Sequence, residues 1–143
     1  MNKSLNFLSR ALIAVIFLIS GFMKVANYQA MVGMGASAGL PLPSISMALA
    51  AFVEIAAGLA LVAGWQQRSA SLALFLYLIP ATLIFHAAKL GDPAQAQMQM
   101  VEVLKNLAIM GGLLKFYVDA SAEASGHLTS PASVDEFRHR RAS

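Results

Sequence analysis

The apolar run Ile45–Gly64, interrupted by a single carboxylate at Glu54, is the feature that most limits what this chain can fold into. Twenty helical residues rise about 30 Å, which is the thickness of the hydrocarbon core of a bilayer. We therefore predict a membrane-spanning helix with Glu54 near its centre. Because a charge at that depth costs about 2.5–3.5 kcal/mol on insertion scales, we expect Glu54 to face the interior of a helix bundle and to have a polar partner.

The composition of the whole chain agrees with a membrane protein. It has 143 residues, of which 58% are hydrophobic and only 12% are charged. The length allows one small domain and no separate soluble catalytic domain. Because the chain has no cysteine, thiolate nucleophiles, disulfide exchange, iron–sulfur ligation and cysteine zinc sites are excluded. The formal net charge of +3 follows from basic residues at helix ends and in the tail, so we predict no nucleic-acid partner.

Three further segments predict an all-α fold, an integral membrane four-helix bundle; they are Asn2–Met23, Ser69–Ala88 and Val101–Val118. A cleaved signal peptide is the alternative for the first segment. The absence of an Ala-x-Ala-like cleavage site and the apolar spans that follow argue against it. The last segment contains charged and amide side chains, which a bundle can accommodate when they face inward.

The remaining segments are predicted to be non-helical connections and a tail. Glycine and proline between Val25 and Pro43 predict a loop, with the part around Tyr28–Val32 on the membrane surface. Ala94–Met100 reads as a polar connector. We expect residues 1–118 to form the bundle and residues 119–143 a cytoplasmic polar tail. Within the tail, a capping box predicts a short helix at Val134–Arg141, with a disordered terminus as the alternative.

Orientation follows from the Lys and Arg residues. With four spans, the side that holds both termini and the second loop has seven of the ten: Lys3, Arg10, Arg68, Lys115, Arg138, Arg140 and Arg141. The other side has Lys24, Lys89 and Lys105. The positive-inside rule therefore predicts that both termini are cytoplasmic, in the inner membrane of a bacterial cell.

This topology brings polar residues together in the outer half of the bundle. Glu54 and His86 are the candidate catalytic residues, and Lys24, Lys105 and Asn106 are the candidate ligand-binding residues. We expect at least one of the other four to lie within direct or one-water reach of Glu54, because an unpaired buried carboxylate is costly. At the opposite interface, Arg10 and Arg68 are candidates for binding lipid headgroups.

Each of these assignments has a structural alternative. Glu54 can form a buried pair that only fixes helix register, and a histidine near a helix end often only bonds at the headgroup level. Glu54 and His86 are two candidate ligands without close spacing, so we predict no metal site. The eight methionines are more typical of flexible packing than of copper ligation.

Several short motifs occur in order along the four spans: Arg10, Gly21-Phe-Met-Lys24, Glu54 with Gly58, Gly64 and Arg68, then His86, and finally Lys105-Asn106. From about Leu5 to Tyr117, the chain resembles the DoxX family of small four-helix bacterial membrane proteins. The resemblance implies a four-helix membrane fold. Some relatives belong to membrane oxidoreductase systems that pass electrons from sulfur compounds to quinone, and others are associated with oxidative-stress complexes. The family supplies no agreed catalytic residue.

Two functional hypotheses follow. In the first, the protein is a membrane subunit of an oxidoreductase, and the outer pocket binds a quinone-like ligand with Glu54 and His86 relaying protons. It then needs a membrane or cytoplasmic oxidoreductase partner, because the chain has no redox group of its own. In the second, the bundle is a non-enzymatic assembly or lipid-binding module whose polar cluster is structural. Both hypotheses place the chain in the lipid bilayer, and both are compatible with a homo-oligomer.

Overall fold

We describe the fold from a computed structural model, which describes residues 3–128, with side chains as far as residue 125. This part of the chain is helical and contains no strand. The helices are α1 (Lys3–Ala26), α2 (Tyr28–Ser37), α3 (Pro43–Ala63), α4 (Gln67–Phe85), the short 3-10 helix η1 (Ala87–Lys89) and α5 (Ala96–Leu128). Three helical segments are long and apolar enough to cross a membrane: α1, α3 and the segment Gln67–Lys89, which joins α4 to η1.

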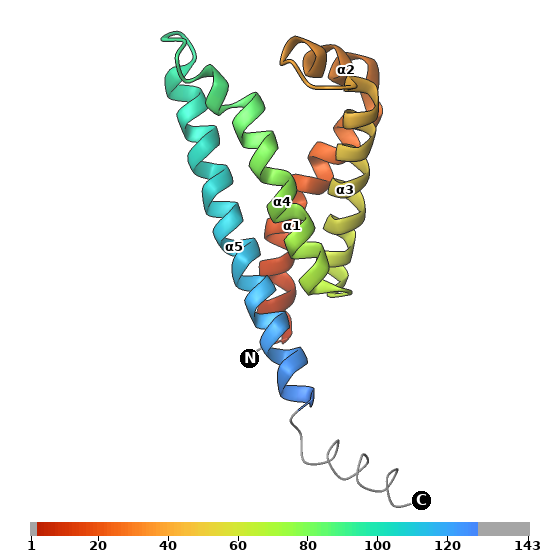
Figure 1. The fold of residues 1–143 in the computed structure, drawn as a ribbon. Coiled ribbons are helices and arrows are strands. Elements are labelled where there is room, and N and C mark those ends of the chain that lie inside the picture. Colours follow the sequence, from red (N-terminus) through yellow and green to blue (C-terminus); the bar gives the residue numbers. More distant parts are fainter. Residues whose placement is uncertain (1–2, 129–143) are drawn as a thin grey trace, which may run out of the picture.

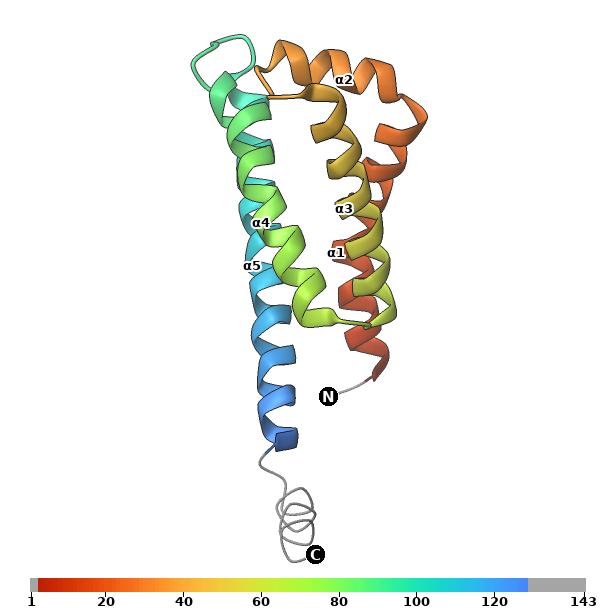
Figure 2. The same ribbon diagram turned by 45° about the vertical axis from the view of Figure 1, so that its right-hand side comes forward.

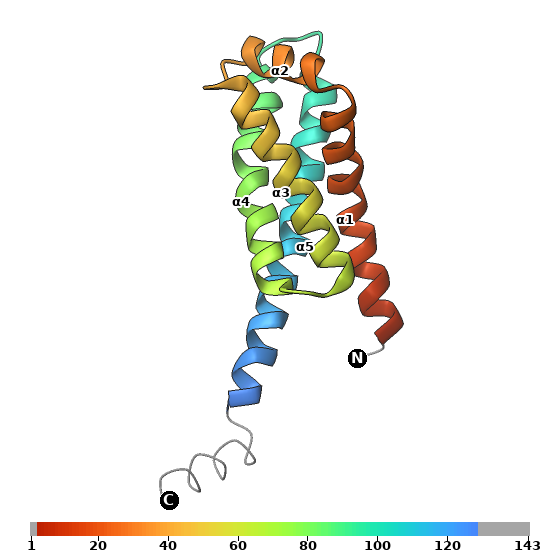
Figure 3. The ribbon, with the colours of Figure 1, turned by 90° about the vertical axis from the view of Figure 1, so that its right-hand side faces the viewer.

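The long helices pack as two pairs. α1 lies along α3, α4 lies along α5, and α3 and α4 join the pairs, whereas α1 and α5 touch only sparsely. The pairs diverge toward the end of the molecule where α2 lies (Figure 1). α2 runs across that end of the molecule (Figure 2). The N-terminal end of α1 and the C-terminal end of α5 lie at the opposite end (Figure 3).

The prediction of a loop over the whole of Val25–Pro43 is wrong, because α2 forms within it. Glycine frequency was misleading here. Of the three glycines in this segment, Gly33 and Gly35 lie inside α2, and only Gly39 adopts a left-handed conformation, with φ of +76°. A helix of ten residues with an apolar composition still agrees with a segment that lies on the membrane surface.

The predicted connector Ala94–Met100 is also wrong in part, since α5 begins at Ala96. Asp92 lies shortly before the first residue of α5. Its Oδ1 accepts a hydrogen bond from the backbone N–H of Ala94 at 3.0 Å, and its Oδ2 accepts one from Gln95 Nε2 at 2.6 Å. At the other end, α5 continues past Val118, where Lys115 forms an ion pair with Asp119 one turn later. The helix therefore does not end at the predicted boundary between bundle and tail. The predicted helix at Val134–Arg141 lies outside the described residues.

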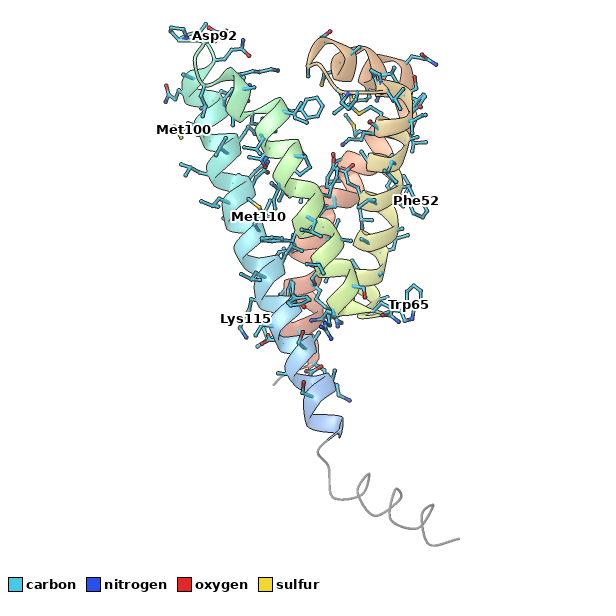
Figure 4. The ribbon with its side chains drawn as sticks, in the orientation of Figure 1. Phe52, Trp65, Asp92, Met100, Met110 and Lys115 are labelled. Atoms are coloured by element: carbon cyan, nitrogen blue, oxygen red, sulfur yellow. The ribbon has the colours of Figure 1, made fainter. Side chains whose placement is uncertain are left out.

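The side chains are arranged as expected for a protein in lipid. Large apolar side chains cover the outside, and Figure 4 shows Phe52 and Met100 pointing away from the bundle. Small residues lie where helices meet. A Cβ on Gly21 would come within 2.7 Å of Ile55, and one on Gly58 within 2.9 Å of Leu18. Membrane helices associate through close packing at small residues, because in lipid there is no hydrophobic driving force for helix association.

Candidate functional site

Glu54 is buried where α1, α3 and α4 meet, with 3% of its surface exposed. Its neighbours one turn away on α3, Ala51 and Gly58, are buried as well, so the carboxylate lies on the face that α3 turns into the bundle. Glu54 Oε2 is 2.8 Å from Lys24 Nζ, and Glu54 Oε1 accepts a hydrogen bond of 2.9 Å from the Tyr77 hydroxyl. The prediction that Glu54 lies within reach of at least one of the four other candidates is confirmed, since Lys24 contacts it.

Lys24 reaches Glu54 from the last turn of α1. Its Nζ donates to Ser20 Oγ at 2.6 Å, one turn earlier on the same helix, and its side chain is 14% exposed. An ammonium group has three N–H bonds. One is donated to Ser20, and the ammonium lies beside Glu54 Oε2 as an ion pair without hydrogen-bond geometry, so at least the third N–H of Lys24 is unused.

Tyr77 is the residue of this cluster that sequence reasoning missed. It comes from the middle of α4, and its hydroxyl donates to Oε1 of the carboxylate, whose Oε2 faces Lys24 in the ion pair. A signal was present: Tyr77 is a lone tyrosine in an otherwise apolar span, and a buried tyrosine hydroxyl normally requires a polar partner.

A second polar cluster lies where the end of α4 meets the start of α5. His86 Nδ1 is 2.9 Å from Gln99 Oε1, and His86 Nε2 is 4.0 Å from Glu102 Oε2, while Glu102 forms an ion pair with Lys105. Because an amide oxygen only accepts, Nδ1 carries the proton and Nε2 is the nitrogen that can take one up. Gln99, which is 6% exposed, was also missed, since it fell in the predicted connector.

Asn106 belongs to this second cluster. It is buried, and its Nδ2 donates to Thr82 Oγ1 at 3.0 Å; Thr82 in turn donates to the carbonyl of Leu78 at 2.6 Å. His86 and Asn106 thus connect α4 and α5, Lys105 pairs with Glu102 on α5 itself, and Glu54 is paired with Lys24 and Tyr77 instead. The predicted convergence produces two clusters rather than one.

One cavity of about 330 Å³ connects the clusters. Its polar lining comes from both pairs of helices: Ser20, Lys24, Glu54, Tyr77, His86, Lys89, Gln99, Glu102, Lys105 and Asn106. Its apolar lining includes Ile16, Phe17, Met31, Met34, Met47, Leu78 and Ile109. A mostly apolar pocket with a few convergent polar groups is the usual form of a small-molecule site.

Arg10 and Arg68 lie at the opposite end. Arg10 Nη1 donates to Gln67 Oε1 at 3.3 Å, and its guanidinium lies against Gly64, where a Cβ would be 2.3 Å from Nη1. Gly64 ends α3 with a φ of +73°. Arg68 is exposed and lies 5.3 Å from the centre of the Tyr117 ring. Arg10 therefore has a role in holding the turn between α3 and α4, and lipid headgroup binding by either arginine stays a prediction.

Among the described side chains, those of residues 3–125, no three His, Asp or Glu lie close enough to hold a metal ion. A protein-family model described as DoxX matches residues 5–87 of this chain. The chain is 28% identical over 109 residues to the inner membrane protein YphA of Escherichia coli K12, a match that covers 75% of this chain and 76% of that protein. No solved structure matches. The family match includes Lys24, Glu54, Tyr77 and His86, whereas α5 lies beyond it.

Proposed function

Because the chain belongs to the DoxX family, we propose that it is a multi-pass inner-membrane protein that binds the headgroup of a quinone-like ligand as the membrane subunit of an oxidoreductase system. The similar E. coli protein is itself named an inner membrane protein, and three apolar helical segments here are long enough to cross. The observation that carries the proposal is one cavity lined by two clusters of titratable side chains, one around Glu54 and one around His86.

In this proposal, α5 is the fourth crossing. It turns Gln99 and Asn106 into the bundle and leaves a row of apolar side chains exposed: Met100, Val101, Leu104, Leu107, Leu114 and Val118. Inward polar and outward apolar side chains are what a helix in lipid requires. The distribution of Lys and Arg then places both termini in the cytoplasm and the cavity in the outer half of the membrane.

The donors of the cavity fit a ligand with two acceptor oxygens. A quinone supplies two carbonyl oxygens, and its reduction takes up two electrons, which the oxidoreductase partner provides, and two protons. Lys24 offers its third N–H on the wall formed by α1 and α3. Asn106 uses Nδ2 for Thr82, and an amide nitrogen has a second N–H to offer on the wall formed by α4 and α5.

Each wall also has groups that can move a proton. Glu54 Oε1 accepts from the Tyr77 hydroxyl, and Glu54 Oε2 lies 2.8 Å from the Lys24 ammonium in an ion pair, so a proton can pass between Glu54 and Lys24. On the other wall, His86 holds its proton on Nδ1 and exchanges one at Nε2, 4.0 Å from the Glu102 carboxylate. Glu54 and His86 thus serve as the two proton-transfer residues.

A second candidate function is a non-enzymatic assembly module. The observation in its favour is that both carboxylates of the cavity already have a lysine partner, Lys24 for Glu54 and Lys105 for Glu102. The buried pair of Lys24 and Glu54 joins α1 to α3, and a pair of this kind can serve only to fix helix register.

Glu54→Gln separates the two functions, because it keeps the volume and much of the hydrogen bonding but removes the titrating group. We would measure accumulation in the membrane and quinone-dependent electron transfer in host membranes that lack the chromosomal copy. Proton transfer predicts normal accumulation with loss of electron transfer. Asp119→Asn, which changes a carboxylate outside the cavity, is the control and keeps both. Failure to accumulate would favour the assembly module, and a variant with wild-type behaviour in both measurements would refute a role for Glu54.

A further inference from the structure

The cavity is small for a whole membrane lipid. Its volume of about 330 Å³ lies at the lower end of the ~300–1,000 Å³ of ordinary ligand pockets. It has room for a headgroup, but a long apolar tail has to leave it.

The lining changes from polar to apolar along the helices. On α1 it passes from Lys24 and Ser20 to Phe17, over a rise of about 10 Å at 1.5 Å per residue. On α5 it passes from Gln99 and Glu102 to Ile109, over a rise of about 15 Å. On these two helices the polar part lies near α2 and the apolar part lies toward the middle of the bundle, whereas on α3 the order is reversed, from Met47 near α2 to Glu54 deeper in the bundle. A lipid in the leaflet nearest α2 has the same polarity, with its head at the surface and its tail toward the midplane.

The cavity is bounded at both ends, by the contact of α1 with α5 at its floor and by α2 at its roof, so the tail has to leave it sideways, between helices. At the floor, α1 and α5 meet closely, because a Cβ on Gly112 would lie 2.4 Å from Ile13 Cδ1. Above this contact the two helices diverge (Figure 1), and they touch sparsely overall. At the roof, Met31 and Met34 of α2 line the cavity, and α2 lies across this end (Figure 2). The Tyr77–Glu54 hydrogen bond crosses between α4 and α3, whereas α1 and α5 touch sparsely, so the seam between α1 and α5, where Ile16 and Ile109 line the cavity, is the side that we take to face the bilayer.

We infer that the cavity opens sideways to the bilayer between α1 and α5, and that it takes the head of a single-tailed, lipid-borne amphiphile whose tail stays in the membrane. The inference rests on the proposed function for the nature of the head, since a quinone with an apolar tail belongs to this class. It adds the route of access and the requirement for a tail.

Because the chain contains no cysteine, access can be measured with one introduced thiol. Ser20→Cys places a thiol on the cavity wall beside Lys24, a cation that favours the reactive thiolate. The full-length variant is placed in lipid nanodiscs and treated with N-dodecylmaleimide, which partitions into the bilayer, or with a sulfonated, water-soluble maleimide. We expect faster labelling by the dodecyl reagent. Adding Ile109→Trp to fill the gap should slow that reaction about tenfold or more, because the indole must be displaced from a packed site.

The matched control is Leu107→Trp, which adds the same side chain to the lipid-facing side of α5, where Leu107 is 59% exposed. It should leave the labelling rate unchanged. Ile16→Trp narrows the gap from α1 if the Ile109 variant does not fold, and Ile19→Cys, at a lipid-exposed position, reports folding and reagent delivery. Faster labelling by the sulfonated reagent, no labelling by either reagent, or a dodecyl reaction that neither tryptophan slows would overturn lateral access. No quinone is used, so this result is independent of the Glu54→Gln experiment.

Discussion

Removing the Lys24 ammonium should destabilise the protein strongly. Lys24→Met keeps an unbranched apolar side chain of similar length and leaves Glu54, which is 3% exposed, without its cation at 2.8 Å. Breaking a buried pair by removing one partner costs about 3–5 kcal/mol, because the remaining charge is uncompensated. Tyr77 still donates to Glu54, so we expect a loss near 3 kcal/mol, the lower end of that range.

The assay is reversible unfolding in mixed micelles with increasing SDS, applied to the wild type, Lys24→Met, Glu54→Gln and the double variant. The double variant has no buried charge, so it should be more stable than Lys24→Met alone, and the cycle gives the coupling between the two residues. Lys115→Met is the control: its side chain is 71% exposed, and a surface pair contributes about 0–1 kcal/mol. If Lys24→Met costs no more than the Lys115 variant, or if the cycle shows no coupling, the buried-pair argument is refuted.

Three further predictions follow from the contacts. Tyr77→Phe removes the other donor to Glu54 and should cost about 1.5–3 kcal/mol in the same assay; an unchanged unfolding midpoint would mean that this bond contributes nothing. Gly64→Ala should destabilise by more than about 1 kcal/mol, because φ there is +73° and the guanidinium leaves no space for a Cβ. Gly111→Ala, with nothing within 4 Å, should be neutral or slightly stabilising, and equal effects of the two substitutions would contradict this. A reporter fused to the C-terminus should be cytoplasmic and one inserted at Gly39 external, and the reverse pattern would invert the proposed topology.

Long-range features were predictable where one energetic requirement dominated. The cost of a charge in lipid meant that Glu54 needed a partner, and Lys24 is that partner. Hydropathy over some twenty residues identified α1, α3 and α4, although their ends differ by a few residues from the predicted spans. The family resemblance, based on motifs from Arg10 to Asn106, was confirmed over residues 5–87.

Local features were less predictable because tertiary contacts decide them. α2 contains two glycines that suggested a loop, but neither needs a left-handed backbone. The start of α5 reads as a polar connector, yet Gln99 is buried because it meets His86 from α4. Tyr77 was not singled out from the sequence, because only the crossing of α3 and α4 brings its hydroxyl to Glu54.

The central claim, that the cavity holds the head of a quinone-like amphiphile, is tested most directly by extracting the full-length protein gently and quantifying bound quinone by mass spectrometry. The account predicts a stoichiometric amount in the wild type and in Lys115→Met, and its loss in Lys24→Met that is verified as folded. A wild-type protein that carries no quinone, even after reconstitution with an excess of it, would contradict the claim.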